Sequence, residues 1–139
     1  MQTQTPAEQL LRRVVFSWGI VGTIIIPIFV FFDVFGGWRW APYNAIYDQM
    51  IVSIYFVLGI FLLRASRSPQ QHRSLLWFTV WSSVAHGLVM LFHAITHPGN
   101  LGHLIGDVNI LVGAAALGWA LYKSRATNES GGIDSNARP

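Results

Sequence analysis

The sequence contains no cysteine and few charged residues. The absence of cysteine excludes a disulfide framework, a CxxC zinc site and thiol redox chemistry, and therefore also the membrane thiol–quinone oxidoreductases. Charged residues make up 11% of the 139 positions, whereas a typical soluble domain has about 25%. So little polar surface cannot cover the core of a soluble fold of this size. Disorder is excluded as well, because 53% of the residues are hydrophobic.

Long apolar runs are what the sequence has in abundance, and its mean hydropathy is +0.44. A helix needs about 20 residues to cross a bilayer, and four runs approach this length: residues 14–32, 46–63, 75–95 and 101–122. Backbone groups in lipid must be hydrogen bonded within their own segment, so these runs predict helices. We therefore expect an all-α four-transmembrane-helix bundle in residues 1–122, running up-down-up-down. Residues 123–139 are polar and lack apolar periodicity, and we expect a disordered cytoplasmic tail there.

Helix-breaking and capping residues divide the chain in the same way. Pro27 lies inside the first run and predicts a kink. Asn44 is a predicted N-cap of the second helix. Ser68-Pro69-Gln70-Gln71 has the spacing of a capping box, with Pro69 at the first helical position. His97-Pro98-Gly99-Asn100 predicts the end of the third helix and a tight turn into the fourth.

The positive charges are distributed unevenly between the two sides of the predicted bundle. Of the nine Lys and Arg residues, only Arg39 falls on the side opposite the N-terminus. The other eight share the N-terminal side: Arg12, Arg13, Arg64, Arg67, Arg73, Lys123, Arg125 and Arg138. By the positive-inside rule, both termini face the cytoplasm. The net charge of +3 therefore describes topology and does not indicate a nucleic-acid partner. No small-residue cleavage pattern follows the first run, so we expect an uncleaved helix there.

Polar residues inside the apolar runs are the candidates for function, since a charge at mid-bilayer costs roughly 2.5–3.5 kcal/mol. At about 100° per residue, His86, His93 and His97 fall on one face of the third helix. His103 and Asp107 are four residues apart in the fourth run and also share a face. These faces predict a polar site in the half of the bundle that lies away from the cytoplasm.

The second and third runs carry further polar stripes. Asp48, Tyr55 and Gly59 fall on one face of the second helix, again with spacings of seven and four. Thr79 lies on the histidine stripe of the third helix, whereas Trp81 points the other way. The residues predicted to form the site are therefore His86, His93, His103, Asp107 and Asp48.

Imidazoles and carboxylates at these spacings suit three chemistries. They can bind a transition metal, they can ligate a haem axially, and they can relay a proton or bind a small molecule such as a quinone. The residues also have structural interpretations. His97 at a helix C-terminus and Asp48 near an N-terminus both suit the helix dipole. His103 paired with Asp107 would neutralise that carboxylate internally. On that view the chain is a structural or accessory subunit of a larger membrane complex. Its small-residue patterns, such as Ala114-xxx-Gly118, would then serve helix packing.

Four segments resemble a known family: Tyr47-Asp48-Gln49-Met50, His72-Arg73-Ser74-Leu75, Trp81-Ser82-Ser83 with His86, and Gly102-His103-Leu104 with Gly106-Asp107. The family consists of small bacterial four-helix membrane proteins known only as a domain of unknown function. The resemblance covers about residues 10–122 and implies a multi-pass protein of the bacterial inner membrane. It implies no catalytic residues and leaves enzymatic activity open. The lipid bilayer is the expected partner, together with a second copy of the chain or a membrane complex.

Overall fold

The structure is a computed structural model and describes residues 5–32, 45–97 and 109–136. Within these ranges the chain is helical and contains no strand, which confirms the all-α prediction. The elements, in chain order, are α1 (Pro6–Ile20), the π-helical turn η1 (Val21–Ile25), α2 (Ile26–Phe32), α3 (Ala45–Ala65), the 3₁₀ turn η2 (Pro69–His72), α4 (Arg73–Thr96) and α6 (Asn109–Asn136).

In the part of the chain that the structure describes, three helical segments are long and apolar enough to cross a membrane: Pro6–Phe32, Ala45–Ala65 and Pro69–Thr96. They indicate a membrane protein, because most of their large apolar side chains are exposed on the surface of the molecule. The fourth predicted run, residues 101–122, begins outside the described residues, and α6 covers its second half. The predicted N-cap Asn44 and the predicted turn at residues 98–100 also lie outside the described residues.

A capping box begins the first helix, at a position that the sequence analysis did not identify. The Thr5 Oγ1 accepts a hydrogen bond from the Glu8 backbone N–H at 3.3 Å, and the Thr5 N–H donates to Glu8 Oε2 at 3.1 Å. These bonds satisfy two donors that a helix start leaves unpaired. The capping box predicted at Ser68 is wrong, since the Ser68 side chain makes no capping hydrogen bond. The chain there forms the 3₁₀ turn η2, in which Gln71 N–H donates to the Ser68 carbonyl.

Replacing Thr5 with alanine is expected to destabilise the protein by about 1 kcal/mol, the typical value of a side-chain N-cap. The matched control is Ser68→Ala, which removes a hydroxyl from a position without a capping bond. Thermal unfolding in detergent, followed by far-UV circular dichroism, should show a lower midpoint for the Thr5 variant alone. Equal shifts for both variants would contradict this assignment of the caps.

The helix distortion expected at Pro27 takes the form of a π-helical turn just before that residue. Proline has no backbone N–H, so the carbonyl of Thr23, four residues earlier, cannot receive its usual helical bond. The backbone widens here, and the Ile26 N–H donates to the carbonyl of Val21, five residues back. The Thr23 hydroxyl donates to the carbonyl of Gly19 at 2.7 Å. Residues 6–32 therefore form one long helical segment with a single wide turn.

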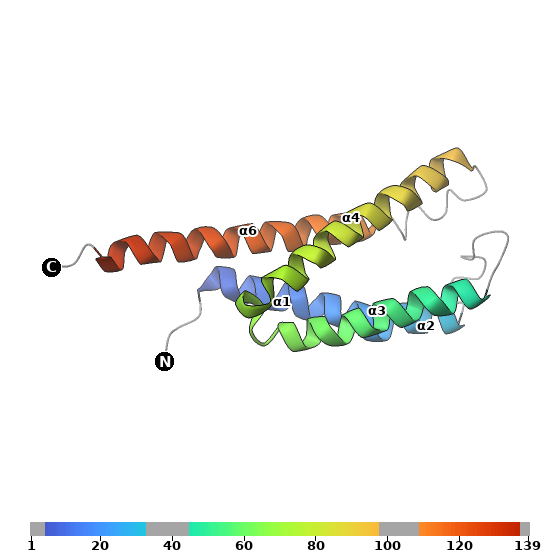
Figure 1. The fold of residues 1–139 in the computed structure, drawn as a ribbon, viewed down its shortest axis with the longest axis horizontal. Coiled ribbons are helices and arrows are strands. Elements are labelled where there is room, and N and C mark those ends of the chain that lie inside the picture. Colours follow the sequence, from blue (N-terminus) through green and yellow to red (C-terminus); the bar gives the residue numbers. More distant parts are fainter. Residues whose placement is uncertain (1–4, 33–44, 98–108, 137–139) are drawn as a thin grey trace.

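Around the bundle, α1 lies beside both α3 and α6, and α4 packs against α6 (Figure 1). In contrast, the backbones of α3 and α4 scarcely approach each other within the described residues. The helices meet closely at one end, which we call the termini end. Two hydrogen bonds define it, from Arg12 Nε to the Ser66 carbonyl at 3.2 Å and from Arg73 to the Leu121 carbonyl at 3.4 Å. The start of α1 and the end of α6 lie on this side in Figure 1.

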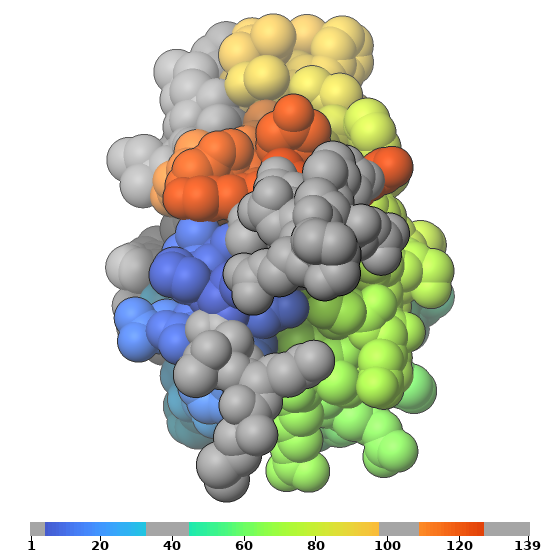
Figure 2. Space-filling model, turned by 90° about the vertical axis from the view of Figure 1, so that its left-hand side faces the viewer, coloured from blue at the N-terminus to red at the C-terminus, as the bar shows by residue number. Residues whose placement is uncertain are grey.

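Most of the core lies in the half of the bundle nearest the termini end. Its members are the buried residues Leu11, Val15, Leu62, Ala65, Leu76, Val80, Leu117, Ala120 and Leu121. Seen from this end, α1 lies between α6 and the segment around η2 (Figure 2). Toward the other end, which we call the far end, α4 diverges from α3 (Figure 1). The buried residues in the far halves of α3 and α4 are small or medium-sized: Val52, Gly87 and Ala94.

Three glycines bring the first helical segment and α3 into backbone contact. A Cβ atom added at Gly59 would lie 2.7 Å from the Thr23 nitrogen and 2.9 Å from the Gly19 carbonyl oxygen. One added at Gly22 would lie 2.7 Å from the Tyr55 carbonyl oxygen. Small residues let transmembrane helices approach closely where lipid provides no hydrophobic drive for association. We call this contact the glycine crossing, after Gly19, Gly22 and Gly59.

The last helix extends further than the sequence analysis expected. A disordered tail is expected from residue 123, whereas α6 continues to Asn136. Part of the reason is that Ser124 is fully buried and its hydroxyl donates to the Leu121 carbonyl at 2.9 Å. A polar residue can thus continue the packed face of a helix. A helix end predicted from composition alone misses such a residue.

Candidate functional site

The polar contact that joins two helices deep in the bundle lies between Tyr55 of α3 and His86 of α4. Their ring centroids are 5.9 Å apart and the ring planes meet at 82°, an edge-to-face arrangement. Each residue lies ten positions from the far end of its helix, Ala45 for α3 and Thr96 for α4. At 1.5 Å per residue both rings are therefore about 15 Å from those ends. Both side chains are half-buried.

This contact joins helices whose backbones scarcely approach each other, so the two rings reach across the space between α3 and α4. An edge-to-face contact involves the ring surfaces, so the imidazole nitrogens can form hydrogen bonds with other groups. A neutral imidazole has one N–H donor and one nitrogen acceptor, and a phenol can both donate and accept. Together, the two side chains provide hydrogen-bonding capacity at mid-depth in an apolar helix pair.

His93 and His97 lie further along α4, at the far end, and both are exposed. Their ring centroids are 5.7 Å apart. The Nδ1 of His97 lies 3.2 Å from the His93 carbonyl and 3.0 Å from the Thr96 hydroxyl. A side chain that bonds the last carbonyls of a helix acts as a C-terminal cap, which agrees with the structural interpretation of His97.

The packing of α4 explains why its histidines are not at the centre of the core. The face of α4 that meets α6 carries small residues, and a Cβ added at Gly87 would contact the Leu111 side chain at 2.6 Å. His86 and His93 each precede a buried residue of that face by one position, Gly87 and Ala94. They are therefore turned about 100° away from α6. Trp81, predicted to point away from the histidine face, has 65% of its surface exposed.

Of the remaining predicted site residues, Asp48 lies at the far end. Asp48 is half-buried in the first turn of α3, where a carboxylate interacts favourably with the helix dipole. His103 and Asp107 lie outside the described residues. Within residues 5–32, 45–97 and 109–136, three His, Cys, Asp or Glu side chains nowhere come together closely enough to hold a metal ion. Of the predicted set, the structure thus gives His86 an aromatic partner from another helix.

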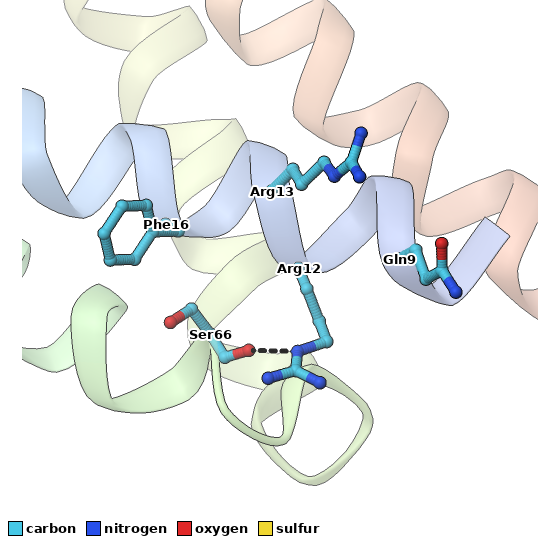
Figure 3. Close-up of a pocket in the computed structure, with 5 residues that line it drawn as sticks. All are labelled: Gln9, Arg12, Arg13, Phe16 and Ser66. Carbon is cyan, nitrogen blue, oxygen red and sulfur yellow. Dashed lines mark hydrogen bonds between the residues drawn. The ribbon is translucent and has the colours of Figure 1, made fainter. Parts of the chain in front are cut away.

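A basic surface depression was not identified by the sequence analysis. It lies at the termini end and is lined by Gln9, Arg12, Arg13, Phe16 and Ser66 (Figure 3). Arg12, Arg13 and Phe16 lie three, four and seven positions after Gln9, which places the four α1 residues on one side of the helix. That spacing was visible in the sequence. The approach of Ser66, 54 positions later in the chain, depends on tertiary packing.

Comparisons with known proteins give a family and no activity. Residues 5–137 match the model of a family described as "Family of unknown function (DUF6632)". This confirms the resemblance to an uncharacterised family. No curated protein and no solved structure matches the chain.

Proposed function

The chain belongs to the DUF6632 family of unknown function, and we propose that it is an integral membrane protein that binds a small lipid-soluble molecule beside His86. The observation that carries this proposal is the contact between Tyr55 and His86 at mid-depth in the apolar helices. An imidazole placed in a hydrocarbon layer costs free energy unless its nitrogens are hydrogen bonded. A ligand with carbonyl or hydroxyl groups would form those bonds.

A quinone-like molecule fits this chemistry best among the three classes that the sequence favours. Such a molecule partitions into the bilayer and carries carbonyl oxygens that accept hydrogen bonds from an imidazole N–H or a phenol O–H. The backbones of α3 and α4 scarcely approach each other, so a flat ring can enter from the lipid between the side chains of these helices. A transition metal needs several converging ligands, and the described residues offer no such group.

We assign the other predicted site residues to the same proposed site, toward the far end of the bundle. Asp48 lies in the first turn of α3, which carries Tyr55, and His93 lies in the last turn of α4, which carries His86. His103 and Asp107 belong to the segment that connects α4 to α6. In this proposal they line the entrance to the site, with Asp107 orienting His103 or sharing its proton.

We also propose that the protein forms four spans of a bacterial inner membrane, with both termini in the cytoplasm. Three helices long enough to cross support this arrangement. The basic residues of α1, the α3–α4 connection and the start of α4 gather at the termini end, as the contacts of Arg12 and Arg73 indicate. The far end would then face away from the cytoplasm.

Replacing His86 with phenylalanine is expected to weaken binding of a short-chain benzoquinone about tenfold, the typical effect of losing one hydrogen bond of about 1.4 kcal/mol. Phenylalanine retains a ring that can keep the edge contact with Tyr55, so the fold should persist. Binding is measured by quenching of tryptophan fluorescence in the detergent-solubilised full chain. The matched control is His97→Phe, since His97 is exposed at the end of α4 and should leave binding unchanged.

Measurements on the same purified protein distinguish binding of a small molecule from binding of haem or a metal. An absorption spectrum with a Soret band, or metal at stoichiometric amount that is lost in His93→Ala, would favour haem or a metal over a small molecule. Unchanged quinone binding in His86→Phe would contradict the proposal. If the chain is instead an accessory subunit, the double variant Asp107→Asn and His103→Gln should fold and leave the activity of a partner complex intact.

A further inference from the structure

We propose that the depression on α1 binds the phosphate headgroup of an anionic phospholipid. This site is separate from the ligand site at His86, because it lies at the termini end whereas His86 is at mid-depth in α4. The depression has a volume of about 350 Å³ and is lined by Gln9, Arg12, Arg13, Phe16 and Ser66 (Figure 3).

The lining of the depression is suited to an anionic headgroup because it contains two guanidinium groups and an amide, with Arg12 directed toward Ser66 and Arg13 extending in another direction (Figure 3). Arginine presents several N–H donors in a planar fork that matches phosphate geometry. The Arg12 Nε donates to the Ser66 carbonyl at 3.2 Å, which fixes the position of this guanidinium against the end of α3. Gln9 and Arg13 lie one turn apart on the same helix face. The charge at this site is therefore partly preorganised.

The position along the helix indicates a lipid and not a soluble anion. Arg12 and Arg13 directly precede the apolar run that begins at Val14, so they lie at the level where phospholipid headgroups are found. Phe16, one turn further into that run, lines the same depression and is 52% exposed. A headgroup bound to the arginines would have its glycerol and acyl chains beside this ring.

Other basic residues at this end have different surroundings. Arg73 donates to Gln70 Oε1 at 2.8 Å and to the Leu121 carbonyl at 3.4 Å, so it ties α4 to α6. Arg67 is exposed in the connection between α3 and α4 and does not line the depression. It carries the same charge near the same end of the molecule, and it is therefore the control for a merely electrostatic effect of surface charge.

The test is native mass spectrometry of the full chain in detergent micelles, titrated with phosphatidylglycerol, phosphatidylcholine or inorganic phosphate. We expect phosphatidylglycerol to bind in preference to phosphatidylcholine. Arg13→Gln should weaken binding of phosphatidylglycerol about fivefold, as expected for one basic residue at an anionic headgroup, whereas Arg67→Gln should not. Arg13 is the first choice because it is exposed and its replacement leaves the bond between Arg12 and Ser66 in place.

Two further results decide the source of the phosphate. Phe16→Ala should weaken phosphatidylglycerol binding and leave binding of inorganic phosphate unchanged. Inorganic phosphate that binds as tightly as the lipid would overturn the assignment to a phospholipid. Equal losses in Arg13→Gln and Arg67→Gln, or none in Arg13→Gln, would overturn the site itself. His86→Phe should not change lipid binding, so this proposal and the proposed quinone site can fail independently.

Discussion

Replacing Gly59 with alanine should destabilise the protein by about 3 kcal/mol, the upper part of the usual range for overpacking. The added methyl group would lie 2.7 Å from the Thr23 nitrogen and 2.9 Å from the carbonyl carbon of Gly22. These are backbone atoms, which cannot move aside as a flexible side chain can. The first helical segment and α3 must therefore separate along the glycine crossing.

The chain contains a matched control for this variant. A Cβ atom at Gly118 of α6 would have the Val80 Cγ1 at 3.7 Å as its nearest contact, an ordinary van der Waals distance. Gly118→Ala should therefore be neutral or slightly stabilising, because alanine favours helix over glycine by about 1 kcal/mol. Both variants are compared by thermal unfolding in detergent with circular dichroism. Similar midpoints for Gly59→Ala and wild type would show that α1 and α3 do not touch at this crossing.

Replacing Leu117 with alanine is expected to cost about 3 kcal/mol, within the range measured for cavities left by buried leucines. Leu117 of α6 is fully buried and belongs to the core at the termini end. In lipid the loss comes mainly from missing packing contacts, since the membrane interior is as apolar as the protein core. The effect should thus depend on burial inside the bundle and not on hydrophobicity as such.

Leu88→Ala makes the same chemical change on the outside of the bundle. Leu88 of α4 is 54% exposed, and lipid chains can fill the space that its side chain leaves. We expect a change of less than about 0.5 kcal/mol, the usual limit at sites without packing or hydrogen-bond roles. A loss in Leu88→Ala as large as in Leu117→Ala would indicate that this face of α4 is covered by protein, for example by a second copy of the chain.

Helix content could be predicted from the sequence because it follows from composition. The run around Ile54, for example, has too few polar groups to be anything other than a helix in lipid. Details that depend on single hydrogen bonds were predicted less accurately than helix content. Ser68 and Thr5 both begin a capping-box pattern, and only Thr5 is followed by an acid three residues later, at Glu8. The π-turn before Pro27 also depends on a single bond, from the Ile26 N–H to the Val21 carbonyl.

The candidate site could likewise be predicted from the sequence only in part. Periodicity placed Tyr55 and His86 on the polar faces of their helices, and the structure brings their rings together. Periodicity could not show that His93 is exposed, because this depends on the divergence of α4 from α3 toward the far end. The basic depression was missed for a related reason, since Ser66 reaches Arg12 only through the fold.

The neighbouring positions of α1 and α6 determine when this protein can finish assembling. During synthesis α1 and α3 can pair as soon as the second apolar helix has been inserted, since the glycine crossing lies between them. The inner face of α1, which includes Leu11 and Val15, also needs α6. A ribosome must therefore complete almost the whole chain before this face is covered. Until then the half-built protein offers a packing surface to chaperones, proteases or another nascent copy.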